Sequence, residues 1–513
     1  MVASSLAYEH NHRYDLKPVV RYAELPQEDI KWCTVSLADV INANKRLDAT
    51  VFDVDGKHAR EVITNCKWES VPLYGSEGLS NAYTGGRFKR IWLETSDFPI
   101  YQPSSITDIK PTPDGFLSHL TKTNLDALRV HKGQILLSCS GTIGKVALVS
   151  ATLDNKIFSH DLIRMDIKNS SDIGFVYAFL RSKIGNTILQ TNNYGAVIKH
   201  IEPEHLAEIP IPNPSDLIKA RINDLIMRSF MLRDESNELI DRATNLLVKA
   251  LNLPPIHELD ITRLFSGTDV NNYNVKLSEL AGRLDGSYHV PIITAIKEHL
   301  HKHASEVTNV GDNRVSKRII LPGRFKRVYV KEGQGRVFFG GKQLHELDPS
   351  SKKYLSISKH SARIKNELEI EENTILITRS GTVGKVNITP KHWEHWIASD
   401  HIIRVIPVDN SIAGYLYIFL TSDYGYSLIT RFTYGSVVDE IDANHVSQIP
   451  FPFLVDADKQ VEINRLALEA NRLRYQAYQL EQEAMRVLDE DVLMTYRSDS
   501  TPLLVAEKES EYL

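Results

Sequence analysis

A glycine-rich loop that occurs twice holds the residues most suggestive of chemistry in this 513-residue chain. Segment 140–146 reads Ser-Gly-Thr-Ile-Gly-Lys-Val, and segment 380–386 repeats it with Val in place of Ile. A nucleotide-binding phosphate loop needs four residues between its glycines and Ser or Thr after its lysine. Because two residues separate these glycines and Val follows the lysine, the spacing argues against a nucleotide site. Each loop predicts a hairpin turn, either structural only or also contacting one DNA phosphate. The candidate phosphate contacts are Ser140, Thr142, Lys145, Ser380, Thr382 and Lys385.

Two His and Asp pairs occupy matching positions in opposite order. His160 precedes Asp161, whereas Asp400 precedes His401. Neighbouring side chains of a strand point to opposite faces, so this exchange does not preserve a catalytic geometry. The alternating histidines of segment 299–303 do not share one helix face as metal ligands would. We therefore predict no catalytic residue and no metal site, and an enzyme with a duplicated active site is the weakest hypothesis.

A short basic segment with a central phenylalanine also occurs twice. Segments 86–90 and 323–327 both read Gly-Arg-Phe-Lys-Arg. On a strand, the Phe would point to one face as an anchor, while Arg and Lys on the other face meet phosphate or only solvent. The candidate DNA contacts here are Arg87, Lys89, Arg90, Arg324, Lys326 and Arg327.

Two polar loops at matching positions differ in sequence although their flanking residues agree. They span residues 190–199 and 431–438 and carry side chains that can read base edges. The candidates are Gln190, Asn192, Asn193, Lys199, Arg431 and Tyr434. A protein that reads two different half-sites would show this pattern of divergence.

All these segments belong to an internal duplication. Positions 140 and 380 differ by 240, and the Arg-Leu-Asp tripeptides at 46–48 and 283–285 differ by 237. Each copy closes with Ile-Pro-x-Pro, at 209–212 and at 449–452. Strand-like runs flank each glycine loop, and a helical pattern follows. A repeat this long indicates a duplicated mixed domain, because solenoid repeats run to about 20–50 residues.

A long helix with a heptad pattern follows each copy. In the first helix the pattern comprises Leu225, Leu232, Leu239 and Leu246; in the second it comprises Leu466, Leu473, Leu480 and Val487. The companion positions hold Ile or small residues, at 222, 229, 236 and 243 and at 463, 470, 477 and 484. Heptads require a helical partner, so we expect the two helices to pair as an antiparallel coiled coil. The alternative is that each helix packs only on its own domain.

The expected organisation is an α/β (α+β) chain with two similar globular domains separated by this coiled coil. The expected bounds are a lead segment 1–45, domain one 46–216, helix one 217–253, a linker 254–282, domain two 283–455, helix two 456–492 and a polar tail 493–513. A short helix is also expected at 37–45.

Composition narrows the functional class. Hydrophobic residues make up 42% and charged residues 24%, as in ordinary globular proteins, and no apolar run is long enough to span a membrane. Three unpaired cysteines and a polar start favour the cytoplasm. A net charge of −5 argues against a uniformly basic surface, although local basic patches can still bind nucleic acid.

In the order of its motifs the chain resembles the specificity subunit of type I restriction-modification systems. The resemblance rests on two copies of Arg-Leu-Asp, Gly-Arg-Phe, Ser-Gly-Thr-x-Gly-Lys-Val and Ile-Pro-x-Pro, each followed by a heptad helix. It implies two target-recognition domains that read the halves of a bipartite, asymmetric double-stranded DNA target. It also implies two methyltransferase subunits as partners, and restriction subunits in complexes that cleave. S-adenosylmethionine, ATP and Mg²⁺ would belong to those partners, and this chain would bind no cofactor.

The competing hypothesis is a protein-interaction scaffold of a defence complex that does not read DNA. The heptads and the negative net charge are compatible with it. The basic segments distinguish the hypotheses, because only a DNA-binding protein needs them.

Overall fold

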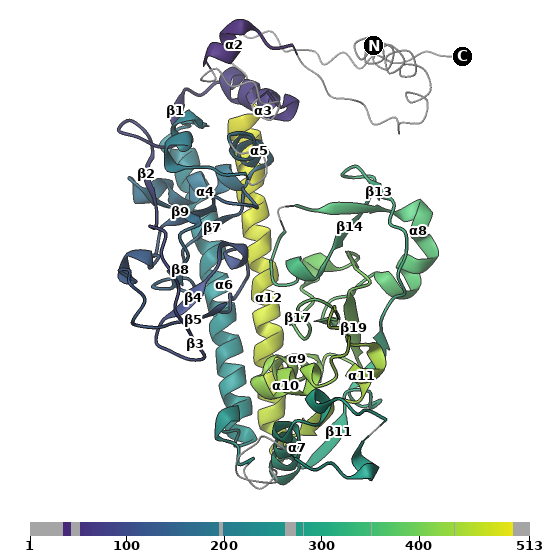
Figure 1. The fold of residues 1–513 in the computed structure, drawn as a ribbon. Helices are drawn as coiled ribbons and strands as arrows, with labels where there is room; N and C mark the ends of the chain where they lie inside the picture. The colour runs from purple at the N-terminus through teal and green to yellow at the C-terminus, as the bar shows by residue number, and fades with distance from the viewer. Residues whose placement is uncertain are drawn as a thin grey trace, which may run out of the picture.

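Two sheet-containing domains flank a pair of long antiparallel helices in the computed structural model (Figure 1). The structure describes residues 34–42, 52–193, 199–261, 273–280, 282–349, 351–435 and 437–495. This arrangement confirms the fold class expected from the duplication. A short helix, α2 (Leu37–Asn42), begins where the sequence predicts it, and residues 43–45 lie outside the described part.

The first domain contains two four-stranded sheets, with strand orders β2-β9-β6-β7 and β3-β5-β4-β8. Its elements are α3 (Val54–Asn65), β1 (Ser70–Pro72), β2 (Ser80–Thr84), β3 (Trp92–Leu93), β4 (Pro99–Tyr101), β5 (Gly115–Leu117), β6 (Ile135–Ser138), β7 (Val146–Leu148), β8 (Ile157–Phe158), β9 (Leu162–Ile167), α4 (Ile173–Arg181), α5 (Lys183–Thr191) and β10 (Pro210–Pro212).

The second domain repeats this topology, with sheets of order β12-β19-β16-β17 and β13-β15-β14-β18. Its elements are α7 (Pro291–His303), β11 (Glu306–Asn309), β12 (Ser316–Ile320), β13 (Tyr329–Val330), β14 (Gly335–Phe339), β15 (Lys353–Ser356), α8 (Ile357–Arg363), β16 (Ile375–Thr378), β17 (Val386–Ile388), β18 (Ile397–Ala398), β19 (Ile402–Pro407), α9 (Ala413–Thr421), α10 (Asp423–Thr430), α11 (Ala443–Ser447) and β20 (Pro450–Phe453). The two copies therefore share their fold as well as their sequence motifs.

Prolines often end regular structure, but the Ile-Pro-x-Pro segments belong to strands. They form β10 and β20, which pair antiparallel with β1 and β11 in separate two-stranded sheets. Each of these strands has only one neighbour, and proline is tolerated on such edge strands because its missing N–H interrupts no central ladder.

The two long helices lie side by side and run in opposite directions. Helix α6 spans Asp216–Ala250 and helix α12 spans Ala457–Leu488. The Ser229 hydroxyl donates a 2.7 Å hydrogen bond to the Ala477 carbonyl, and Arg221 lies 3.5 Å from Glu483. Their 35 and 32 residues correspond to about 50 Å at about 1.5 Å per residue. The predicted antiparallel pair is confirmed.

The seam between the helices follows a heptad spacing, but in both helices it is displaced by one residue from the predicted heptad leucines. Its positions in α6 are 222, 226, 229, 233, 236, 240, 243 and 247, and their counterparts in α12 are 463, 467, 470, 474, 477, 481, 484 and 488. The predicted companions are thus in the seam. Leu225, Leu232, Leu239 and Leu246 are half-buried beside it, and three of them pack against the domain cores. In α12 Leu466, Leu473 and Val487 are buried, and Leu480 is half-buried.

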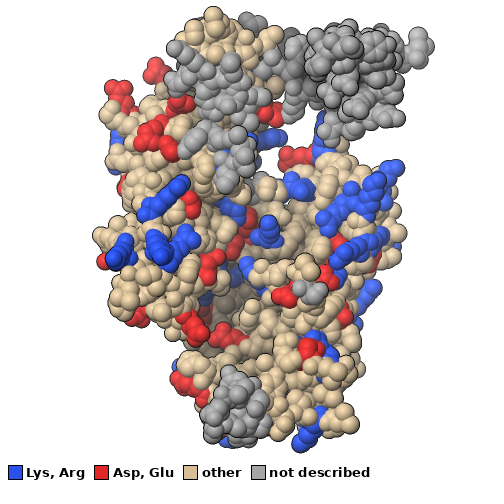
Figure 2. Space-filling model, in the orientation of Figure 1, with Lys and Arg blue, Asp and Glu red and all other residues tan. Residues whose placement is uncertain are grey.

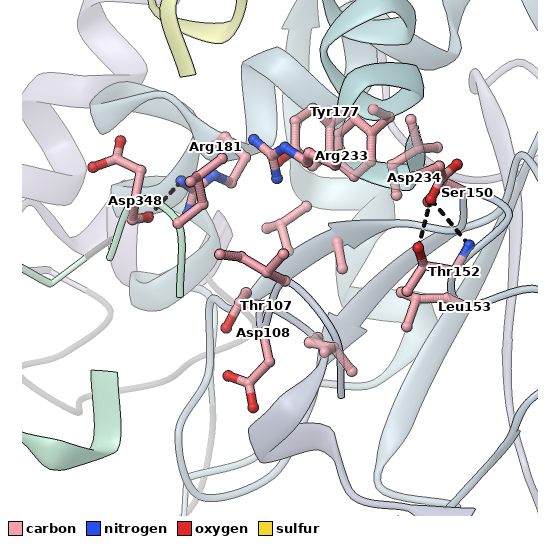
Figure 3. Close-up of a pocket in the computed structure, with 17 residues that line it drawn as sticks. Thr107, Asp108, Ser150, Thr152, Leu153, Tyr177, Arg181, Arg233, Asp234 and Asp348 are labelled. Carbon is pink, nitrogen blue, oxygen red and sulfur yellow. Dashed lines mark hydrogen bonds between the residues drawn. The ribbon is translucent and has the colours of Figure 1, made fainter. Parts of the chain in front are cut away.

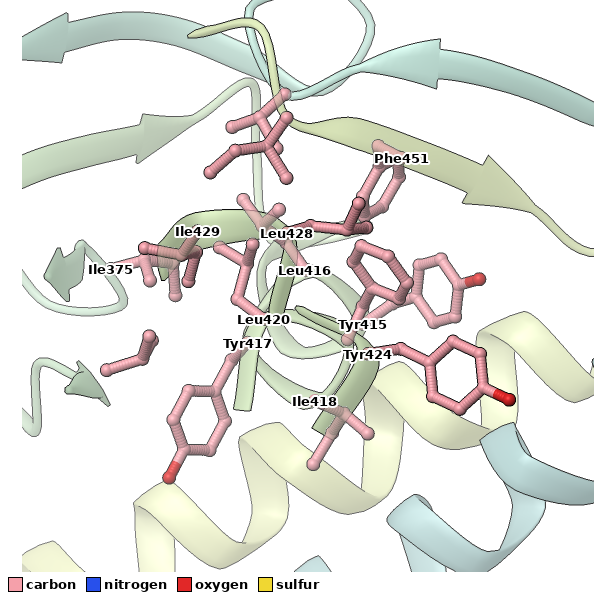
Figure 4. Close-up of a cluster of buried hydrophobic side chains, with 14 of the residues drawn as sticks. Ile375, Tyr415, Leu416, Tyr417, Ile418, Leu420, Tyr424, Leu428, Ile429 and Phe451 are labelled. Atoms are coloured by element: carbon pink, nitrogen blue, oxygen red, sulfur yellow. The ribbon is translucent and has the colours of Figure 1, made fainter. Parts of the chain in front are cut away.

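Each long helix starts beside its own domain and ends in the core of the other. Ile240, Ala243 and Leu247 of α6 belong to the second domain's core, which surrounds α9 (Figure 4). Ala484 and Val487 of α12 belong to the first domain's core. The alternative in which each helix packs only on its own domain is therefore wrong, and the two domains share their apolar burial.

Each domain also contacts the helix that follows it through an asparagine and a glycine. The Asn223 side chain accepts a 2.8 Å hydrogen bond from the Gly174 N–H at the start of α4. Asn464 accepts the equivalent 2.8 Å bond from Gly414 at the start of α9. A Cβ atom on Gly414 would lie 2.4 Å from the Asn464 carbonyl oxygen, so this close crossing requires glycine.

We predict that Gly414→Ala destabilises the protein by about 1–3 kcal/mol, because the added methyl group pushes α9 away from α12. Equilibrium denaturation measures the change. Gly86→Ala is the matched control, since a Cβ atom there meets nothing within 4 Å. Equal stability of the two variants would contradict the close crossing.

A buried ionic cluster joins α4, α6 and α12. Glu481 is 1% exposed, and its carboxylate accepts a 3.1 Å hydrogen bond from the Tyr177 hydroxyl and pairs with Arg233 and Arg181. Burial by itself would raise the pKa of Glu481, but the two arginines and the Tyr177 hydrogen bond hold it below its usual value. The corresponding residue of α6 is Ile240, so the cluster exists on one side of the molecule only.

We predict that Glu481→Gln costs about 3–5 kcal/mol at pH 7, because it leaves buried arginine charges without a counter-ion. The lowered pKa means that the carboxylate stabilises the fold above the ordinary Glu value of 4.5. The difference between wild type and variant therefore shrinks as the pH falls below 4.5 towards the folded-state pKa. Denaturation at several pH values measures this, with Glu490→Gln, at an exposed pair with Arg486, as the control. A difference independent of pH would contradict the assignment.

Candidate nucleic-acid interface

The two Gly-Arg-Phe-Lys-Arg segments present cations on the surface of both domains. Phe88 and Phe325 pack against small apolar clusters, whereas the Arg and Lys on either side of each are exposed. The alternation of side chains is as predicted, but the strand is not. Residues 85–91 and 321–328 have no ladder partner and form extended links before β3 and β13. The exposed cations of the two segments are Arg87, Lys89, Arg324 and Lys326.

The last arginine of each segment is engaged within the protein. The Arg90 guanidinium lies 5.9 Å from the Phe88 ring centroid and 6.0 Å from that of Trp92. Arg327 pairs with the buried Asp400 at 2.5 Å. Burial by itself would raise the pKa of Asp400, but the hydrogen bond from Arg327 holds it below its usual value. Arg90 and Arg327 therefore orient the segments rather than extend from them.

An exposed aromatic ring follows each segment at the same register. Trp92 in β3 is 49% exposed and Tyr329 in β13 is 43% exposed. The Lys353 ammonium lies 5.4 Å from the Tyr329 ring centroid. Figure 2 shows Lys and Arg gathered on the outer flanks of both domains, on one face of the molecule. Cations beside exposed rings are typical of surfaces that bind nucleic acid.

The glycine loops are hairpin turns, β6 to β7 and β16 to β17. Gly141, Gly144, Gly381 and Gly384 have φ between +71° and +98°, the left-handed region that favours glycine. Thr142 and Thr382 are exposed at the tips. The hydroxyls of Ser140 and Ser380 contact Nδ1 of His200 at 2.7 Å and of His401 at 2.6 Å. In the second domain His401 of the Asp400-His401 pair thus contacts the turn, whereas in the first domain His200, which lies outside the His160-Asp161 pair, takes that position.

Lys145, predicted as a phosphate contact, is engaged inside the molecule. Its ammonium lies 2.8 Å from the Glu346 carboxylate of the other domain and also donates to the Ser104 carbonyl at 2.7 Å. Its charge is already matched, so we correct its role to that of a link between the domains. Lys385 has no ion pair among the described residues.

Three of the predicted base-reading side chains lie inside their domains. Asn192 and Asn193 are 6% and 2% exposed and donate to the backbone carbonyls of His205 and Gln190. Arg431 is 9% exposed, with its guanidinium 4.2 Å from the Tyr288 ring centroid. Burial and these contacts keep all three from a base edge, which corrects the prediction. The candidates that remain exposed are Gln190, Lys199 and Tyr434; residues 194–198 and 436 lie outside the described part.

In the second domain the Arg-Leu-Asp motif makes contacts that its sequence does not predict. Arg283 pairs with Asp285 at 2.7 Å and donates to the Phe432 and Thr433 carbonyls at 3.0 and 2.9 Å. The motif therefore holds the start of the variable loop 431–438 in place. The first copy, at 46–48, lies outside the described residues.

Within the described part of the chain, no three His, Cys, Asp or Glu side chains are grouped so that they could hold a metal ion. No described helix has the length and apolar character needed to cross a membrane.

No curated protein matches the sequence of this chain. A solved S subunit of a type I restriction-modification system from M. genitalium is 14% identical, over 85% of this chain and 98% of that one, with a TM-score of 0.28. The HsdS subunit from Thermoanaerobacter tengcongensis is 14% identical, over 83% and 100%, with a TM-score of 0.25. The family model of the type I restriction modification DNA specificity domain matches residues 67–230 and 326–466, one segment in each domain. Because these two segments cover more than half of the chain, the protein belongs to the family of type I restriction-modification DNA specificity domains.

Proposed function

We propose that this chain binds a bipartite, asymmetric DNA target, with one half-site read by each domain. The observation that carries the proposal is the repeated exposed segment, in which Phe-anchored cations precede an exposed aromatic ring in both domains. Exposed arginine and lysine provide phosphate contacts, which fix the position of a protein on a duplex without reading sequence.

The differences between the two domains support an asymmetric target. Trp92 in one domain corresponds to Tyr329 in the other, and the loops 190–199 and 431–438 share few residues. Side chains that face bases determine which sequence is bound, so unlike readers on similar scaffolds select unlike half-sites. The long helix pair, about 50 Å in length, is compatible with half-sites at least one DNA turn, about 34–36 Å, apart.

Catalysis would reside in partner subunits. We propose that two methyltransferase subunits, and restriction subunits where the system cleaves DNA, assemble on this chain and are directed to its target. S-adenosylmethionine, ATP and Mg²⁺ would then bind to those subunits. The scaffold hypothesis differs in one respect: it predicts the same assembly without any sequence preference of this chain.

We expect Arg87→Ala with Lys89→Ala, and Arg324→Ala with Lys326→Ala, to weaken DNA binding without changing the selected bases. Each lost phosphate contact reduces the salt slope of the binding constant by about 0.9. The full chain, co-expressed with its modification subunit, is first offered a random DNA library to find its target, and binding is then titrated at several salt concentrations.

The matched control is the double variant Lys57→Ala and Lys302→Ala, which removes two exposed charges from α3 and α7. It should leave affinity and salt slope unchanged. If the wild-type complex selects no sequence from the library, the scaffold hypothesis is favoured over DNA reading.

A further inference from the structure

The two recognition domains touch each other directly beside the helix pair. Asp108 and Glu346 form an isolated antiparallel bridge, and the Ile109 N–H donates a 2.8 Å hydrogen bond to the His345 carbonyl. Each segment of this bridge follows a short 3₁₀ turn, at 103–105 and at 341–343. The same segment of the repeated fold therefore meets its own copy. We call these four residues, together with Lys145, the interdomain contact.

Lys145 supplies the ionic part of the interdomain contact. Its ammonium is 2.8 Å from Glu346, 2.7 Å from the Ser104 carbonyl and 3.2 Å from the Thr107 hydroxyl. The Lys145 and Glu346 side chains are only 17% and 7% exposed. A buried ion pair with additional hydrogen bonds has a defined geometry, and loss of one partner leaves an uncompensated charge.

The interdomain contact is ionic on one side only. Asp108 occupies the place of Glu346 in the other copy but is shorter by one methylene group. Lys385, the counterpart of Lys145, has no ion pair among the described residues. Burial, together with Glu346, raises the pKa of Asp108 to about 7, against the opposite effect of Lys145 and Lys385. The Lys145–Glu346 ion pair is thus formed, whereas the equivalent residues, Lys385 and Asp108, form none because the Asp108 side chain is too short.

Polar and apolar residues of both domains lie at the boundary beside the interdomain contact. A cavity of about 50 Å³ adjoins it and is lined on several sides by polar residues, among them Asp108, Arg181, Arg233 and Asp348 (Figure 3). The Arg181 guanidinium donates to the Asp348 carbonyl at 3.1 Å across this boundary. Because buried polar groups bridge this boundary beside a cavity, removal of one of them can alter the relative orientation of the domains.

Lys145 also connects the interdomain contact with the hairpin turn of the first domain. Its backbone N–H donates a 3.0 Å bond to the Ser138 hydroxyl, which in turn donates to the Thr142 carbonyl at 2.6 Å. The exposed turn and the ion pair therefore belong to one hydrogen-bonded unit. A shift of Glu346 relative to Lys145 would move this turn relative to the second domain.

We propose that the interdomain contact is a positioning device that restricts the number of base pairs allowed between the two half-sites. One base pair more or less moves a half-site by about 3.4 Å along the DNA and rotates it by about 34–36°. The helix pair holds the domains at a distance, and the contact is a second attachment away from the helix axis that resists rotation. The inference rests on the proposed DNA-reading function. It assigns spacer selectivity to Lys145 and Glu346, and not to the helices alone.

The test measures binding of the full complex to its selected target and to targets with one base pair added to or removed from the spacer. We expect Lys145→Met to reduce the preference for the natural spacer at least about fivefold, the lower end of common coupling strengths. The bases selected within each half-site should not change. Lys132→Met is the matched control, because Lys132 is exposed on the first domain and lies outside the interdomain contact. The exchanged pair, Lys145→Glu with Glu346→Lys, should restore part of the preference.

Asp108→Glu tests whether a stronger interdomain contact increases the spacer preference. The longer side chain can reach Lys385 and form a second ion pair between the domains, so the preference for one spacer should increase. This variant keeps the inference testable if Lys145→Met does not fold. Unchanged spacer profiles in folded Lys145→Met and Asp108→Glu would overturn it. A wild-type complex without any sequence preference would instead overturn the proposed function.

Discussion

The exchange of helix ends between the two domains is the constraint on which the rest of the structure depends. Helix α6 contributes Leu247 to the second domain's core, and α12 contributes Val487 to the first domain's core. Burial of apolar surface is the main favourable term in folding, and here neither domain completes its core without the helix of the other. Separation of the domains would expose both cores, so the distance between the two candidate DNA surfaces is tied to the stability of the fold.

Small residues in the seam make this exchange possible. Ser229 and Ala477 meet closely enough for a hydrogen bond from the side chain of one helix to the backbone of the other. Glycines at the starts of α4 and α9 let each domain approach the helix that follows it. The scaffold is thus built from close backbone contacts, which allow little change in side-chain volume.

The duplicated scaffold carries unlike polar groups at equivalent positions, and these differences make the molecule asymmetric. Glu481 corresponds to Ile240, and Glu346 corresponds to Asp108. In both cases one side of the molecule has a complete buried ion pair and the other does not. The same divergence holds for the exposed rings Trp92 and Tyr329. Identical folds therefore need not imply identical half-sites.

Local patterns in the sequence determined much of this architecture. The repeat offsets identified two equivalent domains, the glycines predicted both hairpin turns, and the heptads predicted the antiparallel helix pair. In the basic segments the central phenylalanine predicted which side chains point inward. These features depend on residues only a few positions apart, whose spacing fixes φ, turn type or helix face.

Only the tertiary structure decided which polar side chains remain available. Lys145 and Glu346 are 201 positions apart, and no local pattern predicts that a lysine after a turn meets a carboxylate of the other domain. Asn192 and Arg431 have side chains that can read bases, but they are buried against groups outside their own loops. The seam differs from the leucine pattern by one residue, and in α6 three of the four heptad leucines pack against the domain cores instead. Burial and charge pairing depend on segments that meet only in the folded chain, which is why sequence spacing could not assign them.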